Sequence, residues 1–387
     1  MSRRTVTVLG ATGSIGKSTL DLIYHDRDAF EVVALTANKD VAGLADAAIA
    51  LGAKQAVIGD DALLGELRDR LNGSGVAASA GADAIVEAAA MGADWTMAAI
   101  VGTAGLRPTM AAIEGGATVA LANKESLVSA GEVMTSVTRR AGATLLPVDS
   151  EHNAVFQCFD HDAPDRVSRV ILTASGGPFR TWDYAAMGQI TPAQAVKHPN
   201  WSMGAKISVD SATMMNKGLE LIEAFHLFPV SAEQLDVIVH PQSVVHSMVE
   251  YIDGSVLAQL GTPDMRTPIA HTLAWPARMS TPCERLDLAK IGRLDFEPAD
   301  MTRFPAIALA REALSAGGAR PAVLNAANEE AVAAFLAGRI GFLDIAAIVR
   351  DTLETYDPPA PQSLDEVFAV DREARARACA VMEVFAA

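Results

Sequence analysis

The first half of the chain alternates short β-rich runs with stretches of helical periodicity. Each run is followed by a turn or a helix start; the runs are Val6–Leu9, Val32–Leu35, Gln55–Ile58, Met97–Val101, Thr118–Leu121 and Thr144–Val148. Strands that alternate with helices form a parallel, doubly wound sheet, and its ligands bind beyond the carboxyl ends of the strands. We therefore expect an α/β fold with a Rossmann-like N-terminal domain over residues 1–149, and functional residues directly after its strands.

The pattern changes at residue 150. The β-rich runs become longer there, and a hairpin signal at Asp253-Gly254 separates the last two. These runs cover residues 169–173, 235–240, 243–251 and 255–260. They predict an α+β domain with a partly antiparallel sheet over residues 150–274. A linker over 275–300 then leads to Ala-rich helical periodicity, which predicts an α-helical domain over 301–387.

Residues 175–206 interrupt the middle domain with many glycines and prolines. We expect too many breakers there for a packed element, and a long connection of this kind is typical of a lid or a binding loop. The segment contains Arg180, Lys197 and Lys206 against Asp183, so 3 − 1 leaves it at +2.

The acidic balance of the chain excludes some classes of partner. With 31 basic and 47 acidic residues the net charge is −16, which argues against binding nucleic acid or an anionic membrane surface. Small phosphorylated ligands are not excluded, because a pocket depends on local charge. No apolar run approaches the roughly 18 residues of a membrane-spanning helix. The cysteines, Cys158, Cys283 and Cys379, have no metal or redox spacing, and we expect buried thiols in a reducing cytoplasm.

A glycine-rich turn follows the first predicted strand. Gly10, Gly13 and Gly16 form a G-x-x-G-x-x-G variant of the dinucleotide fingerprint at the start of a helix. Glycines permit the tight turn and a close approach to phosphate, and the helix N-terminus supplies free N–H groups. This context favours a dinucleotide site over a plain turn.

The end of the second strand indicates which dinucleotide binds. NAD enzymes usually place an acidic residue there to hold the ribose 2′-hydroxyl. Here Thr36-Ala37-Asn38-Lys39 follows, with no carboxylate before Asp40. A 2′-phosphate would be attracted by Lys39, so NADPH is favoured over NADH. The alternative interpretation of Lys39 is a solvated loop lysine.

Carboxylates follow the last strand of the N-terminal domain. Asp149 and Glu151 can face one point if the chain stays extended there, and hard cations prefer such oxygens. The alternative is that Asp149 or Ser150 caps a helix over 152–159.

A second polar group lies at residues 208–220. The segment begins with a cluster of capping residues and enters a helix, on which Asn216, Lys217 and Glu220 share a face. Asn216 and Lys217, with Ser211 at the cap, could hold a phosphate, and Glu220 could be a third metal carboxylate. The alternative is a solvated Lys217–Glu220 ion pair that contributes a few tenths of a kcal/mol.

Motifs along essentially the whole chain resemble those of the 1-deoxy-D-xylulose 5-phosphate reductoisomerase family. They are Gly10–Gly16, Ala122–Ser126, Val148–His152, Thr173–Phe179, Lys197–Gly204, Asn216–Glu220, Pro263–His271 and Leu324–Glu329. The resemblance implies a homodimeric enzyme of the methylerythritol phosphate route to isoprenoids. It would convert 1-deoxy-D-xylulose 5-phosphate to 2-C-methyl-D-erythritol 4-phosphate, by retro-aldol and re-aldol rearrangement followed by reduction with NADPH.

The same resemblance implies roles for individual residues. One Mg²⁺ or Mn²⁺ per subunit would be held by Asp149, Glu151 and Glu220. The catalytic residues would be these three with Lys124 and His198. The substrate would contact Lys124, Ser150, Glu151, Ser175, His198, Trp201, Ser211, Asn216, Lys217 and Glu220. The cofactor site would be lined by Thr12, Gly13, Ser14, Ile15, Ala37, Asn38, Lys39, Asp40, Asn123, Glu125, Met203 and Gly204. Trp201 would cover the substrate, and Met203 would lie near the nicotinamide.

Other functions fit this sequence less well. A semialdehyde dehydrogenase needs a nucleophilic cysteine, and no cysteine here follows a suitable strand. A homoserine-type dehydrogenase could use Lys124 but would leave the carboxylates unexplained. A nucleotide-sensing scaffold would show no metal dependence and would not consume its cofactor. His240 and His246 are interpreted as polar core or interface residues.

Overall fold

The computed structural model describes residues 3–201 and 203–385. The chain divides into two compact units. Unit 1 comprises Met1–Ser126, Met134–Asn153 and Asp264–Glu284, and unit 2 comprises Leu127–Val133, Ala154–Pro263 and Arg285–Ala387. Among the described residues, no helix combines the length and the apolar character needed to cross a membrane.

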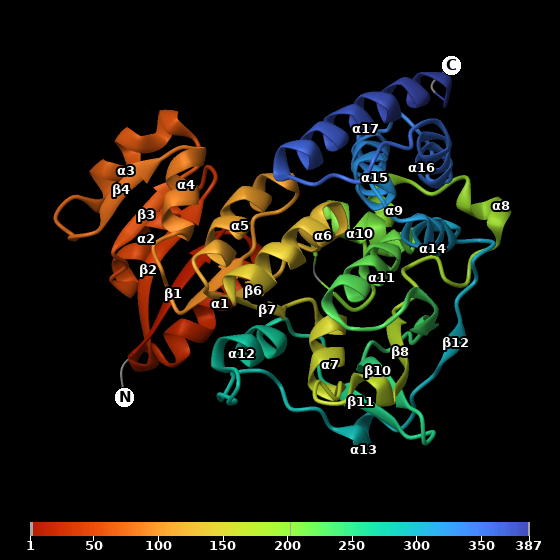
Figure 1. Cartoon of the computed structure of the whole chain (residues 1–387), viewed down its shortest axis with the longest axis horizontal. Helices are drawn as coiled ribbons and strands as arrows, with labels where there is room; N and C mark the ends of the chain where they lie inside the picture. Colours follow the sequence, from red (N-terminus) through yellow and green to blue (C-terminus); the bar gives the residue numbers. More distant parts are fainter. Residues whose placement is uncertain (1–2, 202, 386–387) are drawn as a thin grey trace. The chain divides into compact units, whose positions relative to one another are not determined.

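Unit 1 is built on a parallel sheet of seven strands in the order β4-β3-β2-β1-β5-β6-β7. The strands are β1 Arg4–Leu9, β2 Phe30–Ala37, β3 Gln55–Ile58, β4 Ala77–Ala80, β5 Trp95–Ala98, β6 Thr118–Leu121 and β7 Thr144–Pro147. Figure 1 shows β1, β2 and β3 side by side in the red-to-orange part of the chain. The strand order reverses between β1 and β5, which makes the end of β1 the switch point where such sheets bind ligands. The predicted doubly wound parallel sheet is confirmed.

Helices connect these strands and cover the sheet. They are α1 Ser14–His25, α2 Val41–Leu51, α3 Leu64–Leu71, α4 Ala82–Ala89, α5 Leu106–Glu114 and α6 Lys124–Ala141, with the later α12 Arg266–Ala274. Strand β4 was not predicted, because its sequence Ala-Ala-Ser-Ala lacks the β-branched and aromatic residues that mark strands. Helix α12 packs on α1, and its Ile269 and Leu273 are buried in the core of unit 1.

Unit 2 contains a mixed sheet of five strands in the order β11-β10-β8-β9-β12. The strands are β8 Val167–Ala174, β9 Leu235–Val239, β10 Val245–Tyr251, β11 Val256–Leu260 and β12 Glu297–Pro298. Strands β10 and β11 pair antiparallel, which confirms the hairpin predicted at Asp253-Gly254, whereas β8 and β9 pair parallel. The two-residue strand β12 was not predicted.

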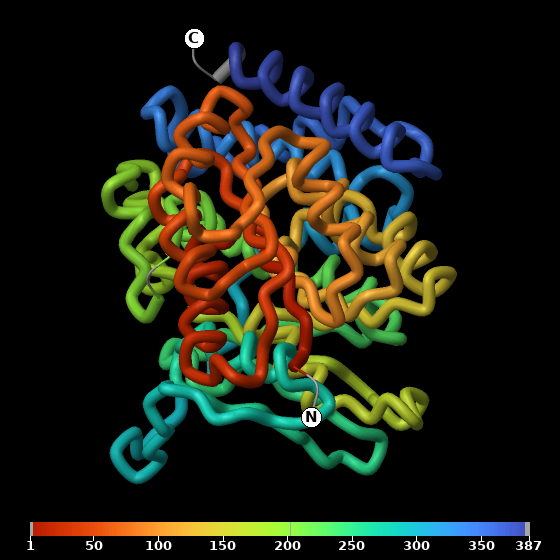
Figure 2. The backbone as a smooth tube through the Cα atoms, turned by 90° about the vertical axis from the view of Figure 1, so that its left-hand side faces the viewer, coloured from red at the N-terminus to blue at the C-terminus, as the bar shows by residue number. Residues whose placement is uncertain are grey.

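Helices make up the rest of unit 2. They are α8 Tyr184–Met187, α9 Pro192–Ala195, α10 Ala205–Ala212, α11 Met215–Leu227, α13 Leu288–Ile291, α14 Ala306–Ala316, α15 Arg320–Leu336, α16 Asp344–Thr355 and α17 Leu364–Phe385. Helix α7, Ser150–Cys158, begins in unit 1 and ends in unit 2. The long C-terminal helix α17, blue in Figure 2, lies against α15 and α16. Helix α15 is buried along most of its length, as expected for the centre of a helical bundle.

The segment 175–206 is more firmly packed than its composition predicts. Phe179, Met187, Ile190 and Ala195 are buried in the core of unit 2, and α8 and α9 lie between the breakers. Widely spaced apolar side chains are sufficient to anchor this segment, so the interpretation as an unpacked element is wrong for residues 179–195. Ser202 lies outside the described residues.

The cysteines differ from expectation in their burial. All three are free, as predicted, but Cys158 and Cys283 are half-buried and Cys379 is exposed on α17. The expectation of buried thiols is therefore wrong, because exposure depends on tertiary packing, which the spacing of the cysteines does not indicate.

Candidate active site

The glycine-rich turn of unit 1 lies at the switch point of the sheet. Gly10 has a φ of +83°, and a Cβ there would lie 2.8 Å from the carbonyl oxygen of Ala99. A Cβ on Gly16 would overlap the backbone of Gly10 and Ala11. Gly13 is exposed, and a Cβ on it would meet only the Gly10 oxygen, at 3.4 Å. The protein itself therefore requires glycine at 10 and 16, whereas the space around Gly13 is open to a ligand.

The turn after β2 carries the predicted ribose-phosphate residues. Ala37 ends the strand and is buried, while Asn38, Lys39 and Asp40 are exposed. The Asp40 carboxylate accepts a hydrogen bond from the N–H of Gly43 at 2.9 Å and caps α2. Asp40 thus has a local structural role, and Lys39 supplies positive charge beside it.

Asn123 follows β6 and joins two loops at the ligand edge of the sheet. Its amide nitrogen donates to the carbonyl oxygens of Ile100 at 2.7 Å and Gly102 at 2.8 Å. Its amide oxygen accepts from the N–H of Ser126 at 3.2 Å and caps α6. Asn123 therefore fixes the edge of the predicted cofactor site through its own side chain, and the predicted Glu125 is buried in the first turn of the same helix.

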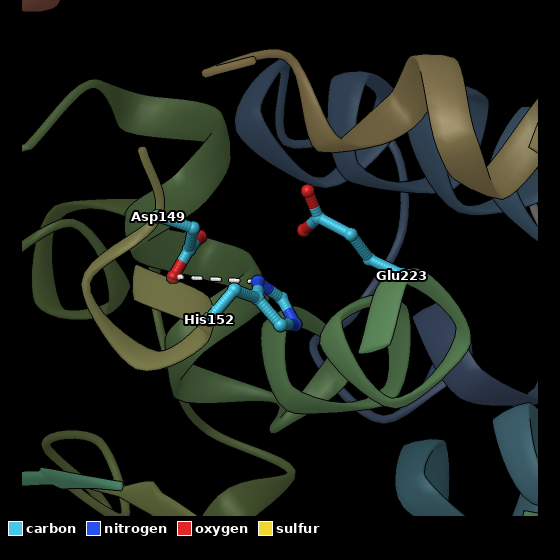
Figure 3. Close-up of side chains that lie close together, drawn as sticks. All are labelled: Asp149, His152 and Glu223. Carbon is cyan, nitrogen blue, oxygen red and sulfur yellow. Dashed lines mark ion pairs between the residues drawn. The ribbon is translucent and has the colours of Figure 1, made fainter. Parts of the chain in front are cut away.

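Lys124 and Asp149 form an ion pair within unit 1. They follow the neighbouring strands β6 and β7, and Lys124 Nζ lies 2.5 Å from Asp149 Oδ2. The Nδ1 atom of His152 lies 4.0 Å from Asp149 Oδ1, the pair drawn with a dashed line in Figure 3. Burial raises the pKa of Asp149, but the charges of Lys124 and His152 outweigh this and hold the pKa well below its usual range. Asp149 is therefore an ionised carboxylate.

The first turn of α7 organises the other carboxylate of unit 1. The helix begins at Ser150, and the Glu151 N–H donates to Asp149 Oδ1 at 3.3 Å. The chain does not stay extended here, because Asp149 accepts a hydrogen bond in the geometry of a capping residue, which agrees with the alternative of a helix cap. The Ser150 hydroxyl donates to Glu151 Oε2 at 2.6 Å.

Helix α11 of unit 2 carries the third carboxylate. The Asn216 amide donates to Glu220 Oε1 at 2.5 Å, and Lys217 Nζ pairs with Glu220 Oε2, so the predicted shared face is confirmed. The Lys217 and Glu220 side chains are 3% and 1% exposed. The alternative of a solvated ion pair is therefore wrong. Because burying such a pair costs desolvation energy, stability alone does not account for it.

The junction between α10 and α11 differs from the predicted cap. Ser211 lies in the last turn of α10, because the helix begins earlier, at Ala205. The residue before α11 is the buried Met214, with a φ of +64°. A left-handed conformation is costly for a residue with a side chain and persists where surrounding structure enforces it, often at functional sites.

Ser175 and His198 form a hydrogen-bonded pair in unit 2. His198 Nδ1 accepts the N–H groups of Asn200 at 3.2 Å and Trp201 at 3.0 Å, so the proton lies on Nε2. Nε2 then donates to Ser175 Oγ at 2.9 Å, and Gly177 N–H donates to the same oxygen at 3.1 Å. Burial lowers the pKa of His198 and favours its neutral form. Because the Ser175 oxygen accepts both of these hydrogen bonds, its hydroxyl proton is left to donate to a ligand.

The end of the predicted lid is held by Asn200, a residue that the sequence did not single out. Its amide donates to Pro241 O at 2.7 Å and Ser243 Oγ at 3.1 Å. The next residue, Trp201, has its ring 6.3 Å from the ring of His246. Met203 is half-buried, and Gly204 precedes α10.

His240 and His246 differ in their surroundings. His240 is fully buried, with Nδ1 2.8 Å from the Asp295 carbonyl oxygen, which confirms its interpretation as a polar core residue. His246 is also buried, but its ring neighbours Trp201 of the predicted site. His152 was likewise not predicted as a site residue. The one sequence signal for His152 is its position three residues after Asp149 at the start of a helix, a spacing that lets the two side chains meet.

The predicted site residues are thus distributed over both units. Unit 1 brings together Lys124, Asp149, Ser150 and Glu151 after the neighbouring strands β6 and β7, and unit 2 carries the hydroxyl, amide and ammonium donors with Glu220. A doubly wound sheet that opens on a glycine-rich turn is the fold of nicotinamide-dependent oxidoreductases, and ionised carboxylates at its ligand edge extend this class to metal-assisted ones.

Sequence comparison gives the family. Profiles described as 1-deoxy-D-xylulose 5-phosphate reductoisomerase, its C-terminal domain and DXP reductoisomerase C-terminal domain match residues 6–131, 145–228 and 260–377. The 1-deoxy-D-xylulose 5-phosphate reductoisomerase of Zymomonas mobilis is 66% identical over 380 residues, 98% of each chain. That of Rhodospirillum centenum is 60% identical, covering 96% of this chain and 92% of the relative. The chain belongs to the 1-deoxy-D-xylulose 5-phosphate reductoisomerase family.

Solved structures agree with this assignment. The Zymomonas mobilis reductoisomerase in complex with NADPH has a TM-score of 0.96 and 64% identity, covering 99% of this chain and 100% of that chain. A DOX-P reductoisomerase in complex with NADPH, fosmidomycin and magnesium has a TM-score of 0.93 and 41% identity, covering 98% of each chain. The semialdehyde and homoserine dehydrogenase alternatives are set aside by this family membership.

Proposed function

We propose that this chain converts 1-deoxy-D-xylulose 5-phosphate to 2-C-methyl-D-erythritol 4-phosphate, with NADPH and a divalent cation. The observation that carries the proposal is the buried Asn216–Lys217–Glu220 group on α11. Within one helical turn it offers a carboxylate suited to a hard cation and two donors suited to a phosphate. A sugar phosphate that chelates a metal through the oxygens on its reacting carbons needs this combination.

The cofactor fits the glycine-rich turn. Space is open at Gly13, the N-terminus of α1 supplies N–H groups, and Lys39 supplies a charge for a 2′-phosphate. The proposed contacts are Thr12, Gly13, Ser14, Ile15, Ala37, Asn38, Lys39, Asp40, Asn123, Glu125, Met203 and Gly204. When bound, NADPH supplies the hydride for the reduction.

The metal fits the donor chemistry of the carboxylates. Asp149 is held ionised by the charges of Lys124 and His152 in spite of its burial, and Glu220 is ion-paired to Lys217, so both present the charged oxygens that Mg²⁺ or Mn²⁺ prefers. We propose that Asp149, Glu151 and Glu220 together hold one such ion per subunit. When bound, the ion supplies Lewis-acid polarisation of the substrate carbonyl. Lys124 keeps Asp149 ionised and offers N–H donors to a substrate oxygen.

The phosphate is assigned to donors of unit 2. Ser175 presents its hydroxyl proton because His198 and Gly177 donate to its oxygen, and Lys217 contributes the counter-charge. Ser211 and Asn216 complete the proposed set. His198 carries its proton on Nε2, and the hydrogen bond from this atom orients the Ser175 hydroxyl.

The lid is assigned a water-excluding role. Residues 196–204 follow the packed part of the segment 175–206, and we propose that this stretch closes over the substrate with Trp201 as its cover. Closure would protect a reactive aldehyde intermediate from water until it is reduced.

The product tests this proposal against a dehydrogenase or a nucleotide sensor. Incubation with 1-deoxy-D-xylulose 5-phosphate, NADPH and Mg²⁺ is expected to yield a branched-chain polyol phosphate, identified by ¹³C NMR of the new quaternary carbon. Recovery of an unbranched polyol phosphate, or of unchanged substrate, would contradict it.

An oligomeric state and a cellular location accompany the proposed function. We propose that the chain forms a homodimer through β11, an edge strand with a neighbour on one side only and with Val256 and Leu257 about half exposed. We also propose a cytoplasmic location, since the three free cysteines suit a reducing compartment.

A further inference from the structure

The motif Leu324–Glu329 on α15 has no part in the proposed chemistry. Asn325 and Asn328 lie one turn apart in this helix, and both are fully buried. An amide in an apolar interior costs stability unless it is hydrogen-bonded, so the partners of these two residues indicate why they are polar.

Asn328 donates to a buried carboxylate on another helix. Its Nδ2 atom lies 2.8 Å from Oδ1 of Asp210 on α10, whose side chain is 1% exposed. The second oxygen of Asp210 lies 2.8 Å from Nζ of Lys206, at the start of the same helix. Asp210 is therefore held from α15 on one side and from the end of the lid segment on the other.

Helix α10 lies between this contact and the proposed phosphate site. Ser211 directly follows Asp210. The turn after β8 packs on the backbone of Ser211, because a Cβ on Gly177 would lie 2.8 Å from the Ser211 carbonyl oxygen. The turn that carries Ser175 thus rests on the last turn of α10, so a shift of α10 would move Ser175 and Ser211 together.

The next helix is fixed separately. A Cβ on Gly218 of α11 would lie 2.8 Å from the Cβ of Ala310 and 3.1 Å from the carbonyl oxygen of Ala306, so α11 packs closely on α14. Between the two fixed helices stands Met214 in its left-handed conformation. A strained residue keeps its conformation only while both flanks are held, and the Asn328–Asp210 hydrogen bond holds one flank.

We propose that Asn328 is a positioning residue for the phosphate site. Through Asp210 it fixes α10, so that Ser211 and Ser175 keep their register with Asn216 and Lys217 on α11. The inference rests on the proposed function, because it concerns recognition of the substrate phosphate.

Alanine substitution tests the contact. Asn328→Ala is expected to raise KM for 1-deoxy-D-xylulose 5-phosphate about tenfold, the effect of losing one hydrogen bond to a charged group, while KM for NADPH stays unchanged. The matched control is Asn325→Ala. Asn325 is equally buried on the same helix but donates to Glu329 at 3.2 Å and Ser129 at 3.4 Å, away from α10. Its substrate KM is expected to stay near the wild-type value.

An exchange of the two side chains separates positioning from folding. Asn328→Asp alone places two carboxylates together and is expected to weaken substrate binding further than Asn328→Ala. The double variant Asp210→Asn with Asn328→Asp restores an amide–carboxylate hydrogen bond and is expected to recover most of the lost affinity. Thermal unfolding of each variant, without ligands, reports stability independently.

The outcomes are distinguishable. If the wild type does not turn over the substrate, the proposed function fails. If the wild type is active but Asn328→Ala leaves the substrate KM unchanged, or alters both KM values equally, the positioning role is wrong. Failure of the exchanged pair to recover affinity while folding normally would also overturn it.

Discussion

Buried lysines accompany the carboxylates of the proposed site in both units. Lys124 pairs with Asp149, and Lys217 pairs with Glu220. Each lysine balances a carboxylate that would otherwise be costly to bury, and each offers N–H donors to an anionic ligand. The site is thus organised at the scale of single residues as charge pairs that a cation and a phosphate can share.

Glu220→Gln tests the third proposed ligand. Replacing the carboxylate with an amide removes a charged oxygen, and we expect kcat to fall roughly a thousandfold, the factor that about 4 kcal/mol represents. NADPH affinity, measured by fluorescence titration, should stay at the wild-type value. Glu223→Gln, an equally buried change three residues further toward the end of the same helix, is the matched comparison. If Glu223→Gln abolishes the response to Mg²⁺ and Glu220→Gln does not, the proposed ligand set is wrong.

Gly13→Ala tests the open space in the nucleotide turn. Because an added Cβ would meet only the Gly10 oxygen, at 3.4 Å, the variant should fold with an unchanged unfolding temperature. The methyl group would nonetheless occupy space proposed for the pyrophosphate, so KM for NADPH should rise about tenfold or more. An unchanged KM for NADPH would place the cofactor elsewhere.

Prediction at the residue scale succeeded where spacing determines geometry and failed where burial decides. Four-residue spacing was enough to place Asn216 and Glu220 on one face. Whether the Lys217–Glu220 pair is solvated depends on the helices that pack around it. The local sequence does not predict that packing. The cap expected at Ser211 was wrong for a related reason, since α10 begins before the polar cluster.

At the scale of elements, α6 and α11 meet in unit 2 through a close contact that includes a histidine, His226. Helix α6 is kinked at Ala130, and a Cβ on Gly131 would overlap the ring of His226 on α11. Burial lowers the pKa of His226 from its ordinary 6.5 to about 4. Glu132 and His226 line one pocket beside this contact.

This contact predicts a loss of stability in acid. Because the pKa of His226 is lower in the folded state, the unfolded chain binds its proton first as the pH falls. The contribution is complete above pH 6.5 and is lost progressively as the pH falls from 6.5 through about 4, at a cost of about 3 kcal/mol. Thermal unfolding from pH 7 to pH 4 should therefore decline less steeply in His226→Gln than in the wild type. Parallel curves would show that His226 does not titrate differently on folding.

Elements were predicted well where their side chains are distinctive. The predicted β-rich runs overlap six of the seven strands of unit 1, although the run 97–101 shares only its first two residues with β5, whereas the Ala-Ala-Ser-Ala of β4 is defined only by its pairing with β3. Breakers in 175–206 suggested a loose loop, but Phe179 and Met187 find partners in the core from distant segments. Such partners are a property of tertiary packing and not of the local sequence.

At the scale of the whole molecule, the free edge of the unit 2 sheet predicts association. If two copies pair through β11, a charge at Leu257, which is 51% exposed, should disrupt the dimer. We expect Leu257→Lys to sediment as a monomer in analytical ultracentrifugation, whereas the wild type sediments as a dimer. Leu288→Lys, at a 56% exposed position on α13, is the matched control and should remain dimeric. A monomeric wild type, or a dimeric Leu257→Lys, would refute pairing through this strand.

The overall charge of −16 describes the whole chain, while the proposed site depends on local positive charge from Lys39, Lys124 and Lys217.

The proposed function requires a divalent cation for the oxidation of NADPH by one sugar phosphate. The most direct test follows NADPH absorbance with 1-deoxy-D-xylulose 5-phosphate, first with Mg²⁺ and then after chelation by EDTA. We predict oxidation only when substrate and Mg²⁺ are both present. Oxidation that continues unchanged after chelation, or no oxidation with all components present, would contradict this account.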